Sequence, residues 1–232
     1  MNFVQVAIPS PLRQTFTYKN QFSSDLIGKR VLVEFGRRKL VGIVISQSKN
    51  FDENYKLKQI DEVLDDSPLF DKQTLKKIIN IANYYMHPIG IVFESFIPSF
   101  LRKAKHQKTL EKYVIKIDSD NAIKSLHTLT RDQKNALNSI ESNDSGEILL
   151  SGITSSGKTE VYKHFIKKLL KKGKSALVLV PEIFLTPQIF NDFQETFGNK
   201  VLLNHSGLTP IQRIKVWLTS QDNKPKIVIG TR

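Results

Sequence analysis

The stretch GITSSGKTEVY, residues 152–162, constrains the fold of this chain more than any other stretch. It satisfies the pattern GxxxxGK[ST], with an apolar run before it and an amphipathic run after it. In that context the glycines let backbone amides approach phosphate oxygens, and the start of the following helix favours an anion. The pattern predicts a phosphate-binding loop between a strand and a helix.

Each side chain of this loop has an expected role. Lys158 is predicted to neutralise the terminal phosphates and Thr159 to ligate the Mg²⁺ that accompanies ATP, so these two are the candidate catalytic residues. Upstream, the spacing of Thr130 and Gln133 is that of a helix cap, and the glutamine amide could instead lie against the adenine edge. The candidate ATP-binding residues are Gln133, Gly152, Ile153, Thr154, Ser155, Ser156, Gly157, Lys158 and Thr159.

The second half of the chain alternates strand-like and helix-like segments. Strands are expected at 147–150, 176–180, 201–204 and 227–229, and helices at 158–172, 186–197 and 211–220. Pro187 and Pro210 each follow a threonine, which is a favourable helix start. This alternation is typical of an α/β domain with a parallel sheet.

The first half has a different pattern. FVQVAI, RVLVEFG and KLVGIVIS read as strands, with a hairpin turn at 36–39, and they predict a small β-barrel or sandwich. Apolar residues at helical spacing then run from 75 to 85, and Pro88 ends that helix. After residue 102 the pattern weakens. We therefore expect a β-domain with a helical extension at 1–105, a short connector at 106–125 and an incomplete RecA-like lobe at 126–232.

The formal net charge of +13 favours a polyanionic partner, because neutralising phosphates with lysine and arginine releases counterions. A solvated lysine-rich surface would give the same composition. The sequence holds no cysteine, which excludes disulfides and thiolate metal sites within it. No apolar run approaches the roughly twenty residues that cross a bilayer, and the first ten residues lack the order of a secretion signal. We expect a cytoplasmic protein with no membrane partner.

Motifs in both halves carry a family resemblance. The segments GITSSGKTEVY, LVPEIFLTPQ, HSGLTPIQR and IVIGTR resemble the first RecA-like lobe of the superfamily 2 replication-restart helicases, the PriA (primosomal protein N′) family. The segments VAIPSPLRQTFTY, RVLVEFG, IDEVLDD and ANYYMHPIG resemble that family's 3′-DNA-end-binding domain, in the same order. The resemblance covers nearly the whole chain except roughly residues 107–125, a connector too short for the family's winged helix.

The resemblance implies a pocket for the terminal nucleotide of a nascent strand. Its matching positions are Phe16, which would stack on the base, Thr17, Gly36, whose backbone would allow close approach, and Lys58, which would face the sugar-phosphate end. On spacing alone Phe16 reads as a core aromatic of the barrel. The family usually has aspartate at the position of Thr17, and glycine at those of Ser155 and Phe184.

The resemblance also implies an activity and partners. The family is an ATP-dependent 3′-to-5′ DNA helicase that recognises stalled forks and restarts replication through primosome assembly. Its partners would be DNA forks, 3′ ends and single strands, together with single-stranded DNA-binding protein and primosome proteins, in the nucleoid region of the cytoplasm. Its acidic Mg²⁺ motif, second lobe and zinc-binding cysteines match nothing up to Arg232, so we expect these residues alone to bind nucleotide weakly and not to hydrolyse it.

Two other functions fit the residues. One is a non-catalytic module that binds DNA forks or 3′ ends and carries a vestigial nucleotide lobe. The other is a small-molecule P-loop kinase, which shares the phosphate loop but leaves the β-domain and the positive charge unexplained.

Overall fold

The computed structural model describes residues 2–22, 24–48, 57–117, 123–143, 146–181 and 186–231. The chain forms two compact units, Met1–Val114 and Ile115–Arg232. The division falls inside the segment that the sequence predicts as the connector. The two units are described separately below.

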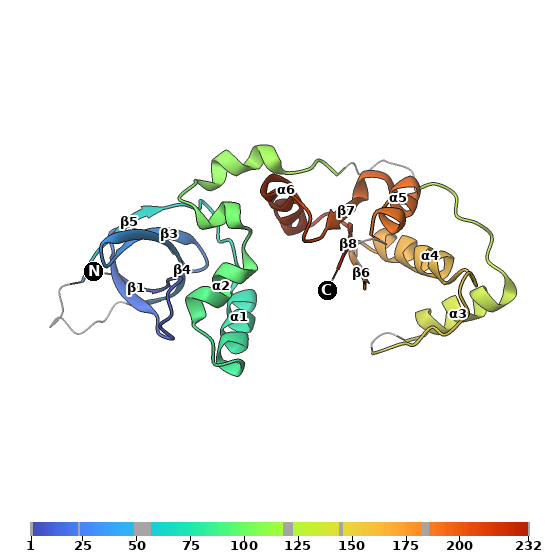
Figure 1. Ribbon diagram of the computed structural model, residues 1–232, viewed down its shortest axis with the longest axis horizontal. Helices are drawn as coiled ribbons and strands as arrows, with labels where there is room; N and C mark the ends of the chain where they lie inside the picture. The colour runs from blue at the N-terminus through green and yellow to red at the C-terminus, as the bar shows by residue number, and fades with distance from the viewer. Residues whose placement is uncertain are drawn as a thin grey trace. The chain divides into compact units, whose positions relative to one another are not determined.

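The first unit is built on a curled antiparallel sheet (Figure 1). Its strands are β1 (Asn2–Ala7), β2 (Phe16–Asn20), β3 (Arg30–Phe35), β4 (Arg38–Ser48) and β5 (Ile60–Val63), in the order β2-β1-β4-β3-β5. An isolated bridge joins Lys19 to Gln59, and the Lys19 amide donates to the Lys58 carbonyl at 2.9 Å. These contacts bring the two edge strands together, so the predicted barrel-like β-domain is confirmed.

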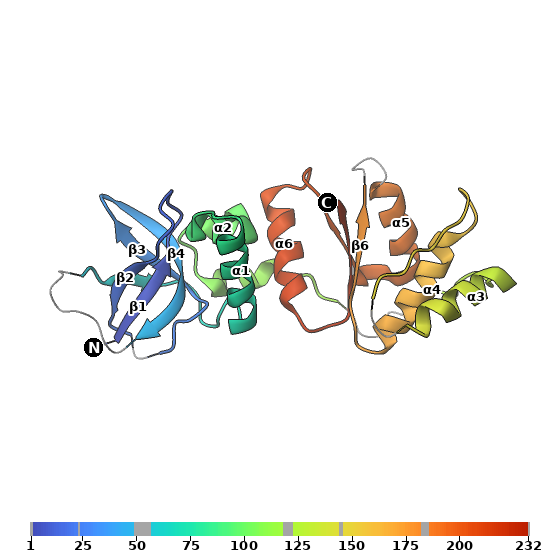
Figure 2. The same ribbon diagram turned by 90° about the horizontal axis from the view of Figure 1, so that it is seen from below.

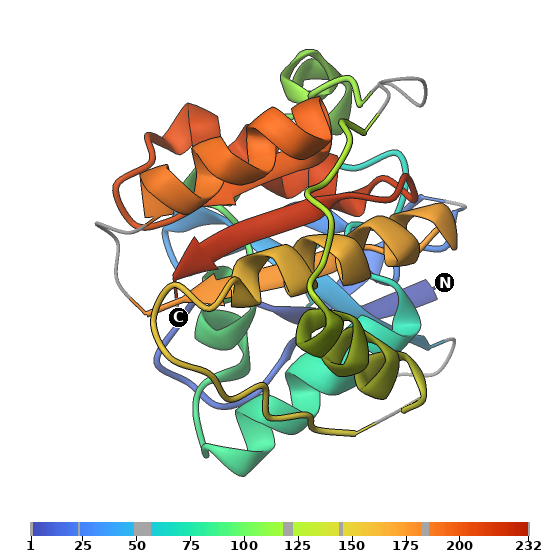
Figure 3. The ribbon, with the colours of Figure 1, turned by 90° about the vertical axis from the view of Figure 1, so that its right-hand side faces the viewer.

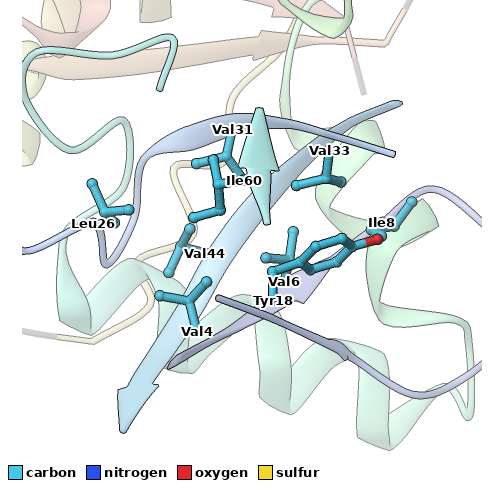
Figure 4. Close-up of a cluster of buried hydrophobic side chains, with 9 residues drawn as sticks. All are labelled: Val4, Val6, Ile8, Tyr18, Leu26, Val31, Val33, Val44 and Ile60. Atoms are coloured by element: carbon cyan, nitrogen blue, oxygen red, sulfur yellow. The ribbon is translucent and has the colours of Figure 1, made fainter. Parts of the chain in front are cut away.

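The barrel encloses an apolar core (Figure 4). Alternate residues of each strand point inward because side chains of a strand alternate between its two faces. The nine buried members are Val4, Val6, Ile8, Tyr18, Leu26, Val31, Val33, Val44 and Ile60. Phe16 and Phe35 pack against this core and are only partly buried. Both rings are therefore part of the barrel and also accessible from outside.

The helical extension follows the barrel. It consists of α1 (Lys72–Tyr84), α2 (Ile89–Phe96) and the short 3-10 helices η1 (Ser99–Arg102) and η2 (Gln107–Tyr113). Helix α1 begins after Asp71, whose carboxylate accepts from the Thr74 amide at 2.6 Å, and it ends before Pro88, as predicted. The later helices were not predicted, because four to eight residues give too little periodicity to identify.

A buried ion pair ties this extension to the barrel. Arg30 of β3 and Asp65, just after β5, are both fully buried, and the Arg30 Nη2 lies 2.5 Å from Asp65 Oδ1. The same guanidinium donates to the carbonyls of Leu101 at 2.8 Å and Lys105 at 3.1 Å. One side chain thus satisfies groups from three separate segments.

The second unit has a three-stranded parallel sheet, which confirms the predicted α/β domain with a parallel sheet. The strands β6 (Ala176–Val180), β7 (Val201–Asn204) and β8 (Ile227–Thr231) lie in the order β6-β8-β7. Helices α4 (Lys158–Lys171) and α5 (Thr186–Phe197) cover one face, and α6 (Pro210–Gln221) covers the other (Figure 2). Figure 3 views the face with α4 and α5 in front of the sheet. The unit also contains α3 (Arg131–Glu141) and the short η4 (Gly198–Lys200).

The prediction of a strand at 147–150 was wrong. These residues are described and form no strand. Leu150 packs against the small cluster of α3 and α4 that contains Leu137 and Val161, whereas Leu149 is 91% exposed. The run of apolar residues has the composition of a buried strand, but a strand also needs a neighbour to pair with, and no described segment pairs with this one.

Candidate nucleic-acid interface and nucleotide site

A pocket opens at one end of the barrel, with a volume of about 460 Å³. Its walls come from the start of β2, the end of β3 and the segment that precedes β5. The lining includes all four positions that the resemblance assigns to DNA binding, namely Phe16, Thr17, Gly36 and Lys58. Residues far apart in the sequence are therefore brought to one site by the closure of the barrel.

The aromatic wall of the pocket is a pair of phenylalanines. The rings of Phe16 and Phe35 meet edge to face, with centroids 4.7 Å apart and an angle of 66° between their planes. This arrangement is favoured by the ring quadrupoles and holds Phe16 in place. Phe35 was not singled out from the sequence, although its place directly before Gly36 was the available signal.

Thr17 lines the pocket and belongs to a small polar cluster with Gln5 and Thr15. Its hydroxyl accepts from the Gln5 side-chain amide at 2.8 Å, and the Thr15 hydroxyl donates to the same amide's oxygen at 2.9 Å. The threonine therefore presents an oriented hydroxyl at the position where the family usually has a carboxylate. Gln5 was not identified from the sequence, and Thr15 lies in the segment VAIPSPLRQTFTY but was assigned no role.

Lys58 supplies the cation of the pocket. Its ammonium donates to Glu34 Oε1 at 2.7 Å and to the Gly36 carbonyl at 3.1 Å. The hydrogen bond from Lys58 lowers the pKa of Glu34 below its usual value. A phosphate that binds at Lys58 would have to compete with this carboxylate.

The turn at Gly36 leaves the rim of the pocket open. Gly36 has φ of 60°, in the left-handed region where side chains are strained, and no atom lies within 4 Å of the place a Cβ would occupy. A ligand can therefore approach the backbone here directly.

The neighbouring Tyr18 hydroxyl donates to the Glu34 carbonyl at 3.0 Å, and burial raises the pKa of Tyr18 to about 12.

The phosphate loop lies in the second unit, before α4. The Lys158 ammonium donates to two carbonyls of its own loop, Gly152 at 2.6 Å and Ile153 at 2.8 Å. The cavity beside it has a volume of only about 140 Å³, whereas sites for drug-sized ligands span roughly 300–1,000 Å³. In this conformation the loop is closed around its lysine.

Gln133 braces the closed loop. Its side chain forms a capping box with Thr130 at the start of α3, and its amide also donates to the Ser156 carbonyl at 3.0 Å. Gly157 has φ of 81°, and a Cβ there would lie 2.3 Å from the Gln133 Nε2. The glutamine is thus adjacent to the loop, with both ends of its amide engaged in protein contacts.

The candidate metal ligand is a single hydroxyl. Thr159 is exposed in the first turn of α4, where it could join the coordination shell of a phosphate-bound Mg²⁺. Within the described ranges, no group of three histidine, aspartate or glutamate side chains forms a metal site. The exposed Thr154 and Ser155 lie in the same loop, and Ser155 has φ of 64°. Phe184 lies outside the described residues.

Two family models match this chain. One is a 3′DNA-binding domain (3′BD), over residues 5–98, and the other is a DEAD/DEAH box helicase, over residues 130–232. In the described part of the chain, no helix is both long enough and apolar enough to cross a membrane.

Several curated relatives match almost the full length of this chain, and others match part of it. The replication restart protein PriA of Treponema pallidum (strain Nichols) is 31% identical over 241 residues, which cover 99% of this chain and 36% of that protein. The PriA of Haemophilus influenzae is 31% identical over 305 residues, which cover 100% and 42%. The PriA of Synechocystis is 50% identical over 86 residues, which cover 37% and 10%. The chain thus spans little more than a third of the length of the first two relatives.

Proposed function

Because this chain belongs to the family of the PriA replication restart proteins, with a 3′DNA-binding domain followed by a DEAD/DEAH box helicase domain, we propose that it recognises DNA 3′ ends at replication forks. In this proposal it does so as part of an ATP-dependent 3′-to-5′ helicase that restarts replication by primosome assembly. The observation that carries the proposal is the barrel-end pocket, which gathers Phe16, Thr17, Gly36 and Lys58.

Each wall of the pocket suits one part of a terminal nucleotide. The exposed face of Phe16 offers a stacking surface for the base, a contact that tolerates any sequence. Lys58 lies where the sugar-phosphate would enter, and the open backbone at Gly36 allows the strand to pass close to the turn. The Thr17 hydroxyl is available to hydrogen-bond the free 3′-hydroxyl or the base.

The helicase domain implies the use of a nucleotide and Mg²⁺. We propose ATP as that nucleotide, held by residues 152–159 once Lys158 has left the loop carbonyls, with Thr159 on the Mg²⁺. The bound nucleotide would supply the energy for strand separation, and the residues here would bind and orient its phosphates. We further propose a location in the cytoplasm with the nucleoid, and contacts with single-stranded DNA-binding protein and primosome proteins.

End recognition is tested by fluorescence anisotropy of the full chain with single strands that differ only in a free or phosphorylated 3′ end. We expect the free end to bind more tightly, because the phosphate adds bulk and charge beside Glu34. Phe16→Leu keeps the apolar packing of the barrel and removes the aromatic face, so it should abolish this preference. Lys58→Ala removes the cation of the pocket, and Lys77→Ala, which removes an exposed lysine of α1, is its matched control. Equal affinity for the two ends in the unsubstituted chain would contradict the proposal.

A further inference from the structure

A second cleft lies on the outer side of the same barrel. It has a volume of about 260 Å³ and is bounded by the start of β4, by α2 and by residues 102–104. Its apolar lining includes Leu32, Val41, Ile43, Phe93 and Ile97. Neither the sequence nor the pocket at the barrel end accounts for this cleft.

The rim of the cleft is basic. Lys39, Arg102 and Lys103 line it together with a single carboxylate, that of Glu94. Arg102 lies 3.6 Å from Glu94, and Lys39 lies 3.3 Å from Asp61. Lys103 forms no ion pair with any residue that the structure describes. An apolar floor beneath an excess of cations suits a ligand with a flat apolar part and an anionic part.

The two pockets share the β3–β4 hairpin. Residues 34–36 line the barrel-end pocket, and residues 39–43 line the cleft. Between them lie the exposed Arg37 and Arg38. The hairpin pairs Glu34 with Lys39 and Phe35 with Arg38, so residues that line the two pockets are cross-strand neighbours near its tip. Cationic side chains therefore lie between one pocket and the other, within reach of a short DNA segment.

We propose that this cleft is a second nucleotide subsite, which holds one unpaired nucleotide to the 5′ side of a DNA end bound in the barrel-end pocket. The inference rests on the proposed function, because the position of that nucleotide is counted from the bound 3′ end. The base would enter the apolar cleft, and its phosphate would lie against Lys103 and Lys39. The volume is below the roughly 300–1,000 Å³ of sites for drug-sized ligands, so the cleft suits a single base whose sugar and phosphate stay outside it.

An abasic scan of the DNA tests the subsite. The full chain is titrated with single strands that end in a free 3′-hydroxyl and carry one abasic position, moved stepwise from the 3′ terminus to the sixth nucleotide. We expect affinity to fall at the terminal position and to fall again by about 5-fold or more at one internal position, with weaker effects at the other positions.

Two exposed residues provide the variants. Ala104→Trp should fill the cleft and remove the second minimum while leaving the terminal one. Lys103→Glu should weaken binding, whereas the matched reversal Lys77→Glu on α1 should have little effect. Circular dichroism of each variant checks that it is folded.

The outcomes separate this inference from the proposed function. If the terminal abasic position weakens binding but no internal position does, the subsite is wrong and the end-binding pocket stands. If Lys103→Glu weakens every strand equally and Ala104→Trp leaves the scan unchanged, the rim contacts phosphates without a base site, and the proposal is again wrong. If even the terminal position has no effect, the proposed function itself fails.

Discussion

Replacing Arg30 should destabilise the first unit more than any surface substitution. In Arg30→Met the fully buried carboxylate of Asp65 loses its cation, and the carbonyls of Leu101 and Lys105 lose their donor. Breaking a buried ion pair by removing one partner costs about 3–5 kcal/mol. A domain's whole stability is about 5–15 kcal/mol, and a loss of this size lowers the melting midpoint of a unit of this length by on the order of 10–30 °C.

Hydrogen exchange followed by mass spectrometry is the suitable assay, because a chain of two units has no single free energy of unfolding. Peptides of the first unit should lose protection in Arg30→Met, and peptides of the second unit should keep it. Adding Asp65→Leu should recover part of the loss, because the double variant buries no lone charge. The exposed pair of Lys108 and Asp66, 3.8 Å apart, is the matched control. Asp66→Asn should change the free energy of unfolding of the first unit by less than about 1 kcal/mol. A change in Arg30→Met as small as in this control would refute the reasoning.

Three further predictions follow from the sites. Gly157→Ala should lower the affinity for a fluorescent ATP analogue, because its Cβ would lie 2.3 Å from the Gln133 amide and would displace that side chain. Unchanged affinity would contradict the role of the loop. Glu34→Gln should tighten binding to DNA by freeing Lys58. The pKa of Glu34 is lowered, so its ion pair with Lys58 is complete above the usual glutamate pKa and is lost as the pH falls through the lowered value. The gain in DNA affinity of Glu34→Gln over the unsubstituted chain should therefore shrink at acidic pH. A gain in affinity that does not depend on pH would contradict the role of this ion pair. Absorbance near 295 nm should show one tyrosine titrating near pH 12, absent in Tyr18→Phe. Because this pKa is raised, the stabilisation from the buried neutral phenol is complete below pH 10 and is lost as the pH rises towards 12; titration of every tyrosine near pH 10 would contradict the burial.

The barrel and the alternating α/β order could be predicted from the sequence because both depend on short-range patterns. The alternation in RVLVEFG and the loop GITSSGKT each specify local geometry within a few residues. Helix α4 begins at the predicted residue, and α1 ends before Pro88 as expected. These features need no knowledge of what the segment packs against.

Long-range pairing could not be predicted in the same way. The 147–150 segment has the composition of a strand, but pairing is a property of two segments, and Leu150 packs on α3 and α4 instead. The partners of Phe16 and Lys58, namely Phe35 and Glu34, come from a strand about twenty residues away from each and depend on the closure of the barrel. For the same reason the outer cleft, assembled from β4, α2 and residues 102–104, left no local signal.

The central claim is that the barrel-end pocket holds a DNA 3′ end. Its most direct test is photo-crosslinking of the full chain to a single strand whose 3′-terminal nucleotide carries a photoreactive base, followed by mapping of the attached peptides. The account predicts crosslinks in peptides that contain Phe16 and Gly36, and few when the same base is placed at the 5′ terminus. Crosslinks confined to residues 115–231, or equal labelling of the pocket from both termini, would contradict it.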